Sequence, residues 1–252
     1  MCTVVTLVRP GHRWPFIVAA NRDEDISRPW KPPARHWPDR PDVIGGLDIQ
    51  AGGTWVGIND TGVVACILNR HGTLSPLAGK RSRGELVLEA LDHADARDAA
   101  GALSDLSARA YRPFNMIVAD NRDAWWLALR DGADRIALER IPEGLSMFTA
   151  GERNDRAETR IDRFLPTFAA ATSPDPDDGT WEKWRDLLAA RAPDDDPAKG
   201  MTFSTKSGFG TSSSSLLALP SPEDAFKTGK KPVWLFAAGP PDSNPFEPVT
   251  LD

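Results

Sequence analysis

Short apolar runs separated by turn residues predict strands in the first part of the chain. Residues 3–8 are rich in β-branched side chains, residues 9–13 contain a Pro-Gly turn, and residues 16–20 form a second apolar run. Together they predict an antiparallel hairpin with residue 2 at its open end. The second strand is expected to end at the polar residues 21–24, which antiparallel pairing would place beside residue 2.

The same patterns predict the elements of the remaining chain. Residues 54–58 and 63–69 flank the turn Asn59-Asp60-Thr61-Gly62, which is a strong hairpin signal. Apolar side chains recur at helical spacing from residue 83 to about residue 109. Further strands are predicted at residues 114–119, 124–129, 135–141, 210–219 and 233–238, and further helices at residues 156–171 and 180–191.

Residues 28–41 contain five prolines, and they predict an irregular loop. Proline cannot donate to a sheet or continue a helix. Trp30 and Trp37 lie in this segment. Two interpretations stay open: the indole rings cover a ligand pocket, or they pin the loop onto the body of the protein.

The order of the elements indicates the fold class. Strands, helices, strands, helices and strands follow one another, and the strands are joined as hairpins. This order predicts an α+β protein, a four-layer αββα sandwich of antiparallel sheets. The sequence contains no internal repeat and no clear linker, so a single domain over residues 1–252 is expected.

Composition narrows the classes of function. The 252 residues carry a net charge of −6, with a pI near 5.3, which argues against a nucleic-acid partner. Two cysteines are too few for a disulfide framework or a cysteine-rich metal site, and the four histidines lack the spacing of metal ligands. No apolar run reaches 18 residues, so no membrane span is expected. Residues 9–13 interrupt the first apolar stretch, unlike a secretory signal, and a cytoplasmic location is predicted.

Cys2 is the main candidate for chemistry because it directly follows the initiator Met1. Removal of the methionine would leave a thiol and a free α-amine on one residue. An amine with a reference pKa of about 7.7–8.0 can take the proton from a thiol of about 8.5. The alternative is a small buried residue that opens the first strand. Cys66 lies inside an apolar run and is interpreted as an inert core thiol.

Short motifs along most of the chain resemble the NRDE proteins, also called the transport and Golgi organisation family. They are Met1-Cys2-Thr3, Ala19-Ala20-Asn21-Arg22-Asp23-Glu24, Gly52-Gly53-Thr54-Trp55-Val56-Gly57-Ile58-Asn59, Leu68-Asn69-Arg70, Ser82-Arg83-Gly84-Glu85-Leu86, Pro113-Phe114-Asn115 and Gly210-Thr211-Ser212-Ser213. The family is similar in turn to N-terminal-nucleophile hydrolases such as penicillin V acylase and bile-salt hydrolase. This resemblance implies the αββα fold and a cysteine exposed by removal of the initiator.

The resemblance also implies roles for individual residues. Cys2 matches the nucleophile, Asp23 the aspartate that orients the nucleophile and its amine, and Asn69 the asparagine that donates to the oxyanion. The arginine that the hydrolases carry at the position of Ala20 has no match here.

Four residues are the candidates for substrate binding. Arg22 and Arg83 are either anchors for a carboxylate or phosphate or members of ordinary ion pairs. Trp55 and His71 complete the predicted substrate-binding set.

Two functional hypotheses follow. The first is an N-terminal-nucleophile hydrolase-like protein that acts on a small amide or thioester through Cys2 and needs no cofactor. The second, which also follows from the resemblance, is a non-catalytic carrier of the same fold with haem or an acyl-lipid as its ligand, linked to lipid metabolism. Haem needs an axial ligand, for which Cys2 and His71 are the candidates.

Overall fold

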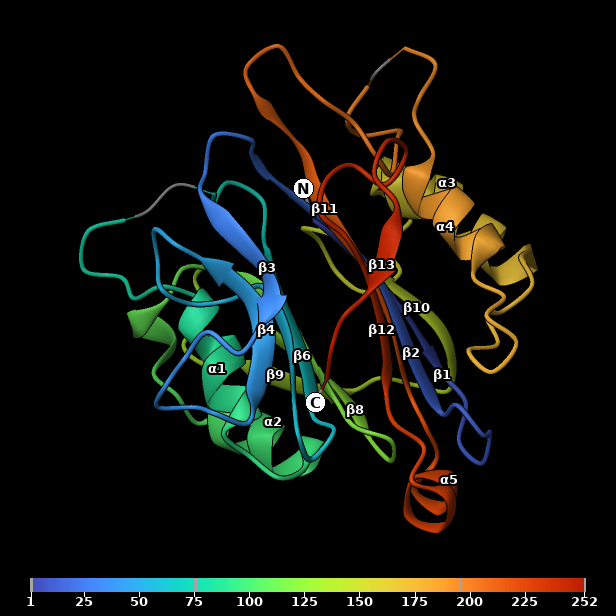
Figure 1. Ribbon diagram of the computed structural model, residues 1–252. Helices are drawn as coiled ribbons and strands as arrows, with labels where there is room; N and C mark the ends of the chain where they lie inside the picture. The colour runs from blue at the N-terminus through green and yellow to red at the C-terminus, as the bar shows by residue number, and fades with distance from the viewer. Residues whose placement is uncertain (1, 75–76, 195, 252) are drawn as a thin grey trace. The chain divides into compact units, whose positions relative to one another are not determined.

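The computed structural model describes residues 2–74, 77–194 and 196–251. The chain divides into two compact units. The first unit comprises Met1–Arg28 and Pro142–Val249, and the second comprises Pro29–Ile141 and Thr250–Asp252. Each unit contains one antiparallel sheet with helices packed on it (Figure 1). The α+β class with antiparallel sheets is therefore confirmed, whereas the single domain over residues 1–252 stays a prediction.

The first unit is built on a six-stranded sheet with the strand order β10-β1-β2-β11-β12-β13. Its strands are β1 (Thr3–Val8), β2 (Phe16–Asp25), β10 (Gly144–Phe148), β11 (Phe209–Leu219), β12 (Val233–Ala237) and β13 (Phe246–Pro248), and its helices are α3 (Thr159–Ala170), α4 (Glu182–Ala189) and α5 (Pro222–Thr228). Helices α3 and α4 lie against this sheet, while α5 connects β11 to β12 (Figure 1).

Alternation along the strands builds the core of the first unit. In β1 and β2, every second side chain points toward α3 and α4, as Val5 and Ile17 do, and packs with apolar residues of these helices. Phe168 of α3 and Trp184 of α4 meet edge to face, with their ring centroids 5.3 Å apart. Fully burying an aromatic side chain of this kind stabilises a fold by about 1.5–3 kcal/mol.

The predicted hairpin of residues 3–20 is confirmed, but its second strand is longer than expected. Strands β1 and β2 pair with Thr3 opposite Asn21. Strand β2 continues to Asp25 because β11 pairs with it on its other side, with Thr211 opposite Asp23. The prediction that the strand ends at residues 21–24 is wrong: these polar residues lie inside β2 and are held there by a strand almost 190 residues later in the chain.

The second unit is a seven-stranded meander, in which each strand pairs with the next along the chain. Its strands are β3 (Trp30–Ala34), β4 (Val43–Asp48), β5 (Val56–Asn59), β6 (Val64–Asn69), β7 (Phe114–Ala119), β8 (Ala124–Leu129) and β9 (Ala137–Arg140). The predicted turn between β5 and β6 is confirmed, since the Gly62 N–H donates to the Asn59 carbonyl at 2.9 Å and Gly62 has a φ of 89°. This left-handed conformation favours glycine.

The predicted helical region of residues 83–109 is divided. Helix α1 covers Gly84–Leu91, helix α2 covers Ala96–Ser104, and a short 3-10 helix covers Ala108–Ala110. The side chain of Asp95 caps α2 by accepting a hydrogen bond from the Asp98 N–H. This cap fixes the start of a new helix, and both α1 and α2 pack on the seven-stranded sheet.

The proline-rich segment is not wholly irregular, as it was predicted to be. Trp30–Ala34 forms strand β3 at the edge of the sheet, and its register with β4 shifts between Lys31 and Ala34. Pro32 and Pro33 lie at this irregularity. An edge strand tolerates proline because one row of its N–H groups has no strand to bond. Along the described residues, no helix is long and apolar enough to cross a membrane.

Candidate active site

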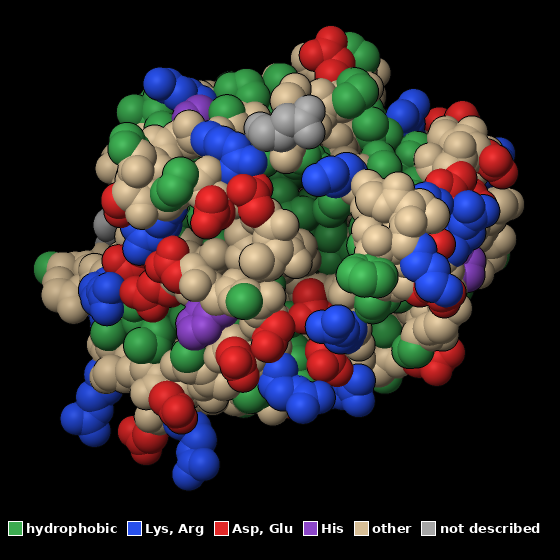
Figure 2. Space-filling model, turned by 60° about the horizontal axis from the view of Figure 1, so that its bottom comes forward, with side chains coloured by type: hydrophobic (Ala, Val, Ile, Leu, Met, Phe, Trp, Pro, Cys, Tyr) green, Lys and Arg blue, Asp and Glu red, His purple; other side chains and the backbone are tan. Residues whose placement is uncertain are grey.

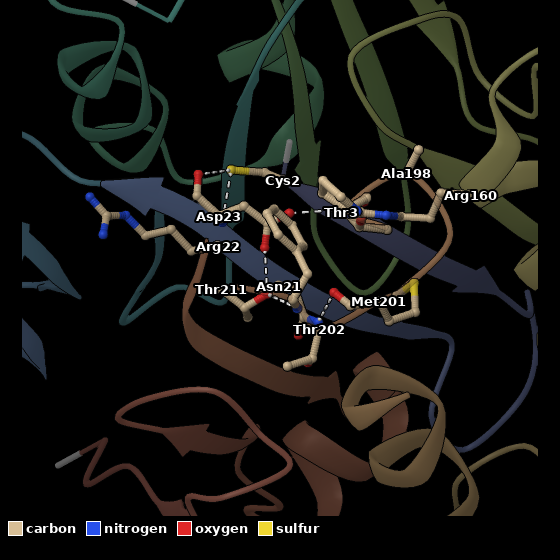
Figure 3. Close-up of polar contacts among 12 residues, drawn as sticks. Cys2, Thr3, Asn21, Arg22, Asp23, Arg160, Ala198, Met201, Thr202 and Thr211 are labelled. Atoms are coloured by element: carbon tan, nitrogen blue, oxygen red, sulfur yellow. Dashed lines mark hydrogen bonds and ion pairs between the residues drawn. The ribbon is translucent and has the colours of Figure 1, made fainter. Parts of the chain in front are cut away.

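Cys2 lies at the open end of the β1–β2 hairpin, directly before the first residue of β1. Its Sγ accepts a hydrogen bond from the Asp23 backbone N–H at 3.4 Å and donates to the Asp23 carbonyl oxygen at 3.5 Å (Figure 3). The predicted proximity of Cys2 to residues 21–24 is therefore confirmed. It arises from the strand register alone, since 21 residues of sequence separate the two partners.

The environment of Cys2 keeps its thiol protonated near neutral pH. The side chain is partly buried, and burial raises the pKa of the Cys2 thiol above its ordinary value. The negative charge of Asp23 raises this pKa further, while the bond from the Asp23 backbone and the charge of Arg22 act in the opposite direction. The sulfur needs a base before it can act as a nucleophile.

The Asp23 carboxylate is held at both of its oxygens. Oδ2 accepts a hydrogen bond from Arg160 Nη1 at 2.9 Å, and Oδ1 accepts one from Thr211 Oγ1 at 2.8 Å. Arg160 Nη1 also donates to Thr3 Oγ1 at 2.8 Å (Figure 3). The Asp23 and Arg160 side chains are fully or almost fully buried, at 0% and 2% exposed. Residues from β1, β2, β11 and α3 thus converge on one carboxylate next to the thiol.

Asn21 fixes the same strand from the position two residues before Asp23. Its Nδ2 donates to the carbonyl oxygens of Leu188 and Met201, both at 2.9 Å, and its Oδ1 accepts from Ser214 Oγ at 2.7 Å. The side chain is buried. It ties β2 to β11, to the end of α4 and to the loop that follows α4.

Arg22 points away from Asp23, as side chains alternate along a strand (Figure 3). Its Nη1 donates to Ser212 Oγ at 3.0 Å, and its Nη2 lies 3.8 Å from a carboxylate oxygen of Glu24. Ser212 is the extra residue where the pairing of β11 with β2 shifts register. Arg22 is therefore a buried cation close to Cys2, and its predicted role in substrate binding stays a prediction.

The remaining predicted site residues belong to the second unit. Asn69 is the last residue of β6, opposite Phe114, and His71 lies in the exposed turn that follows. Trp55 packs edge to face on Trp30, with the ring centroids 5.7 Å apart. Their participation in a site with Cys2 stays a prediction.

Arg83, also in the second unit, holds the backbone of its own surroundings. Its Nη1 donates to Thr73 Oγ1 at 2.8 Å and to the Pro113 carbonyl at 2.9 Å, and its Nη2 donates to the Thr73 carbonyl at 2.8 Å. These bonds tie the turn after β6 to the start of β7. A role of Arg83 as a substrate anchor stays a prediction.

Three further residues, Arg160, Thr211 and Asn21, surround Cys2 and Asp23 and were not among the predicted site residues. The signal for Arg160 is its position in α3: it stands four residues before the buried Phe164, which in turn stands four before the buried Phe168. A charged residue on the apolar stripe of a helix needs a buried partner. The partner, Asp23, could be named only once the strand register was known.

Within residues 2–74, 77–194 and 196–251, no group of three or more His, Cys, Asp or Glu side chains is placed to hold a metal ion. On the face drawn in Figure 2, acidic and basic side chains are interspersed. This distribution differs from the continuous basic surface with which proteins bind nucleic acid.

Comparison with known proteins relates this sequence to one family. The family described as Transport and Golgi organisation 2 matches residues 1–217. Over 112 residues the chain is 39% identical to the Transport and Golgi organization protein 2 homolog of Bos taurus and 40% identical to that of Homo sapiens. Each match covers 42% of this chain and 38% of the relative, so it spans well under half of the relatives' own length.

Solved structures share the fold over most of the chain. A Caenorhabditis elegans ortholog of N-acylethanolamine-hydrolyzing acid amidase superposes with a TM-score of 0.58 at 13% identity, covering 92% of this chain and 98% of its own. The C2A mutant of the conjugated bile acid hydrolase from Clostridium perfringens gives 0.54 at 10% identity, with 99% and 97% covered. Penicillin V acylase from Agrobacterium tumefaciens gives 0.54 at 13% identity, with 94% and 83% covered. Identities this low show the fold alone, and that fold is N-terminal-nucleophile hydrolase-like, as predicted.

Proposed function

Because the chain belongs to the Transport and Golgi organisation 2 family, we propose that it is an enzyme that uses its N-terminal-nucleophile hydrolase-like fold to hydrolyse a small amide or thioester through Cys2. One observation carries this proposal. The Cys2 sulfur lies against the backbone of Asp23, and the carboxylate of Asp23 is held rigidly by Arg160 and Thr211. One of the structural neighbours named above is an ortholog of N-acylethanolamine-hydrolyzing acid amidase, which agrees with this chemistry.

The proposed reaction begins with removal of Met1, which lies outside the described residues. The freed α-amine of Cys2 takes the thiol proton, and the sulfur attacks the substrate carbonyl carbon to form a tetrahedral oxyanion. The carbon–nitrogen or carbon–sulfur bond of the substrate then breaks, and the ammonium returns its proton to the leaving group. A thioester on Cys2 remains. Water, deprotonated by the amine, attacks this thioester, which releases the acid and restores the thiol.

Electrostatics supports the amine as the base. The thiol pKa is raised, so few thiolates exist near neutral pH without help. Proton transfer from the thiol to the amine creates a thiolate and an ammonium. The negative charge of Asp23 disfavours the thiolate and favours the ammonium, so its two effects on this transfer oppose each other. Asp23 thereby stabilises the protonated base while disfavouring a permanently ionised nucleophile.

The oxyanion requires a donor, and we propose Asn69 for this role, as the family resemblance implies. An amide N–H directed at a developing oxyanion contributes about 2.7–4 kcal/mol to the lowering of the barrier. Arg22, Arg83, Trp55 and His71 are proposed to contact the substrate.

A carrier function is the second candidate, and the raised pKa of the Cys2 thiol is the observation that favours it. A neutral thiol is a poor nucleophile, and a protein that only holds a ligand needs no nucleophile. The same raised pKa disfavours Cys2 as a thiolate ligand of haem. Within this alternative, His71 is then the remaining candidate for the axial ligand of haem, whereas an acyl-lipid needs no such ligand.

Two substitutions in one assay separate these functions. Hydrolysis of a panel of N-acyl amides and acyl thioesters is measured for the wild type, Cys2→Ala and Asp23→Asn. Alanine retains a small residue at position 2, and asparagine keeps the shape of Asp23 without its charge. The enzyme proposal expects turnover by the wild type and none by Cys2→Ala. Equal turnover in all three proteins would eliminate this site, whereas no turnover even by the wild type would favour the carrier.

A further inference from the structure

We infer that Arg160 is a positioning residue: it holds the Asp23 carboxylate, and through it the Asp23 backbone, in the geometry that the Cys2 nucleophile requires. This inference rests on the proposed function for its chemical meaning. Arg160 touches neither the thiol nor the reacting atoms in this assignment. It acts on Cys2 through Asp23.

The contacts of Arg160 leave its guanidinium little freedom. Nη1 donates to Asp23 and to Thr3, and Nη2 donates to the Pro197 carbonyl. The guanidinium carbon lies 5.3 Å from the ring centroid of Phe203. These partners come from β1, from β2 and from the loop between α4 and β11, so the planar group is fixed from several sides.

Asp23 transmits this constraint to the sulfur. Its carboxylate is bound by Arg160 on one oxygen and by Thr211 on the other, so rotation of the side chain would break both bonds. Its own backbone N–H and carbonyl oxygen are the groups that contact Cys2 Sγ (Figure 3). One residue thus carries the charge that acts on the Cys2 thiol and the backbone that contacts its sulfur.

Stability alone is a weak reason for this arrangement. Burying two charges requires stripping water from both, and apolar side chains of similar volume often stabilise a fold as well or better. The pair lies directly beside the Cys2 sulfur, which contacts the Asp23 backbone. A carboxylate held in a fixed position next to a thiol therefore indicates a role in the chemistry of that thiol, more than a role in packing.

The pH profile of Cys2 alkylation by iodoacetamide tests this role without any substrate. Arg160→Gln leaves the Asp23 charge uncompensated, so the midpoint of the profile should rise by about one pH unit, which makes alkylation roughly tenfold slower below the midpoint. Asp23→Asn removes the negative charge and should lower the midpoint. Since Arg160 acts through Asp23, Arg160→Gln should shift the midpoint by much less than one pH unit in the Asp23→Asn background (the double variant), where only the direct effect of the Arg160 charge on the thiol remains.

The double variant also guards against misfolding, because it carries no unpaired buried charge. If Arg160→Gln alone does not fold, the comparison of Asp23→Asn with the double variant still decides. A shift well below one pH unit between these two proteins supports action through Asp23. A shift of a full pH unit or more between Asp23→Asn and the double variant, or an unchanged midpoint in a folded Arg160→Gln protein, would overturn the inference. Arg163→Gln is the matched control: Arg163 lies one turn later in α3, is exposed and donates to the Lys199 carbonyl, so its profile should equal that of the wild type.

Hydrolysis of phenyl thioacetate gives the second readout. A positioning residue predicts that Arg160→Gln lowers kcat by about 10- to 100-fold while KM changes less than twofold, with Arg163→Gln unaffected. If the wild type hydrolyses no thioester or amide, the proposed function fails, and the alkylation profiles still decide whether Arg160 positions Asp23. If the wild type is active and the Arg160→Gln variant keeps its kcat, the inference fails and the proposed function stands.

Discussion

Asn21 is expected to stabilise the first unit more than any exposed amide, because its side chain makes three hydrogen bonds inside the protein. Nδ2 donates to Leu188 and Met201, and Oδ1 accepts from Ser214. Asn21→Ala removes all three bonds and leaves two carbonyl oxygens and one hydroxyl without this partner. Each lost bond is worth about 0.5–1.5 kcal/mol, and a buried group left unsatisfied adds to the loss. The sum is a destabilisation of about 3 kcal/mol.

Thermal unfolding followed by circular dichroism measures this loss. For a protein of this size, 1 kcal/mol corresponds to about 2–4 °C in Tm, so Asn21→Ala should lower Tm by roughly 6–12 °C. Asn21→Asp keeps the shape but places a negative charge against two carbonyl oxygens, and should be at least as harmful. Asn244→Ala is the control, because the Asn244 amide donates to a backbone carbonyl, that of Pro240, from a less buried position. If Asn21→Ala lowers Tm no more than Asn244→Ala does, the reasoning about the buried amide is refuted.

Three other substitutions probe the fold and its charges. Arg160→Met should destabilise the protein by about 3–5 kcal/mol in urea unfolding, because it leaves Asp23 buried without its cation. Adding Asp23→Leu should recover much of this loss, whereas additive losses in the double variant would contradict the pairing. Cys66 is buried and its thiol pKa is raised to about 12. As the pH rises, this thiol therefore loses its proton in the unfolded protein before it does so in the folded protein. The free energy of unfolding should fall between about pH 8.5 and pH 12, by up to about 1.4 kcal/mol per pH unit. Cys66→Ala should lack this contribution, so the wild type should lose more stability over this range than the variant. Gly101→Ala in α2 meets no atom within 4 Å and should stabilise by about 0.5–1 kcal/mol; a lower Tm would show that this position is not an open helix surface.

The elements that sequence reasoning located best are those whose pattern is local. Strands β7 and β8 have the predicted bounds, and the turn at Asn59–Gly62 forms as its residues require. Strands β4, β10 and β13 and helix α5 were not predicted. The strand β10, Gly144–Phe148, is short and directly follows Pro142 and Glu143, so its apolar run is too brief to stand out from the loops around it.

The polar part of β2 could not be located from the sequence, for a physical reason. Asn21, Arg22 and Asp23 have the composition of a turn, and pairing with β11 makes them part of a strand. Asn21 and Asp23 are in addition buried on the side of α4 and α3. The position of Cys2 beside Asp23 was predictable, since it follows from hairpin register. The partners Arg160 and Thr211 depend on contacts between segments 137 and 188 residues apart, which no local pattern contains.

The most direct test of Cys2 as an amine-assisted nucleophile is to trap its acyl intermediate. Purified protein is mixed briefly with phenyl thioacetate and quenched in acid, which keeps the amine protonated so that the acetyl group stays on sulfur. The N-terminal peptide is then mapped by mass spectrometry. The proposed mechanism predicts a peptide that begins at Cys2, without Met1, and carries one acetyl group on its sulfur that neutral hydroxylamine removes. A peptide that still begins with Met1, or a Cys2 that stays unmodified while the thioester is consumed, would contradict it.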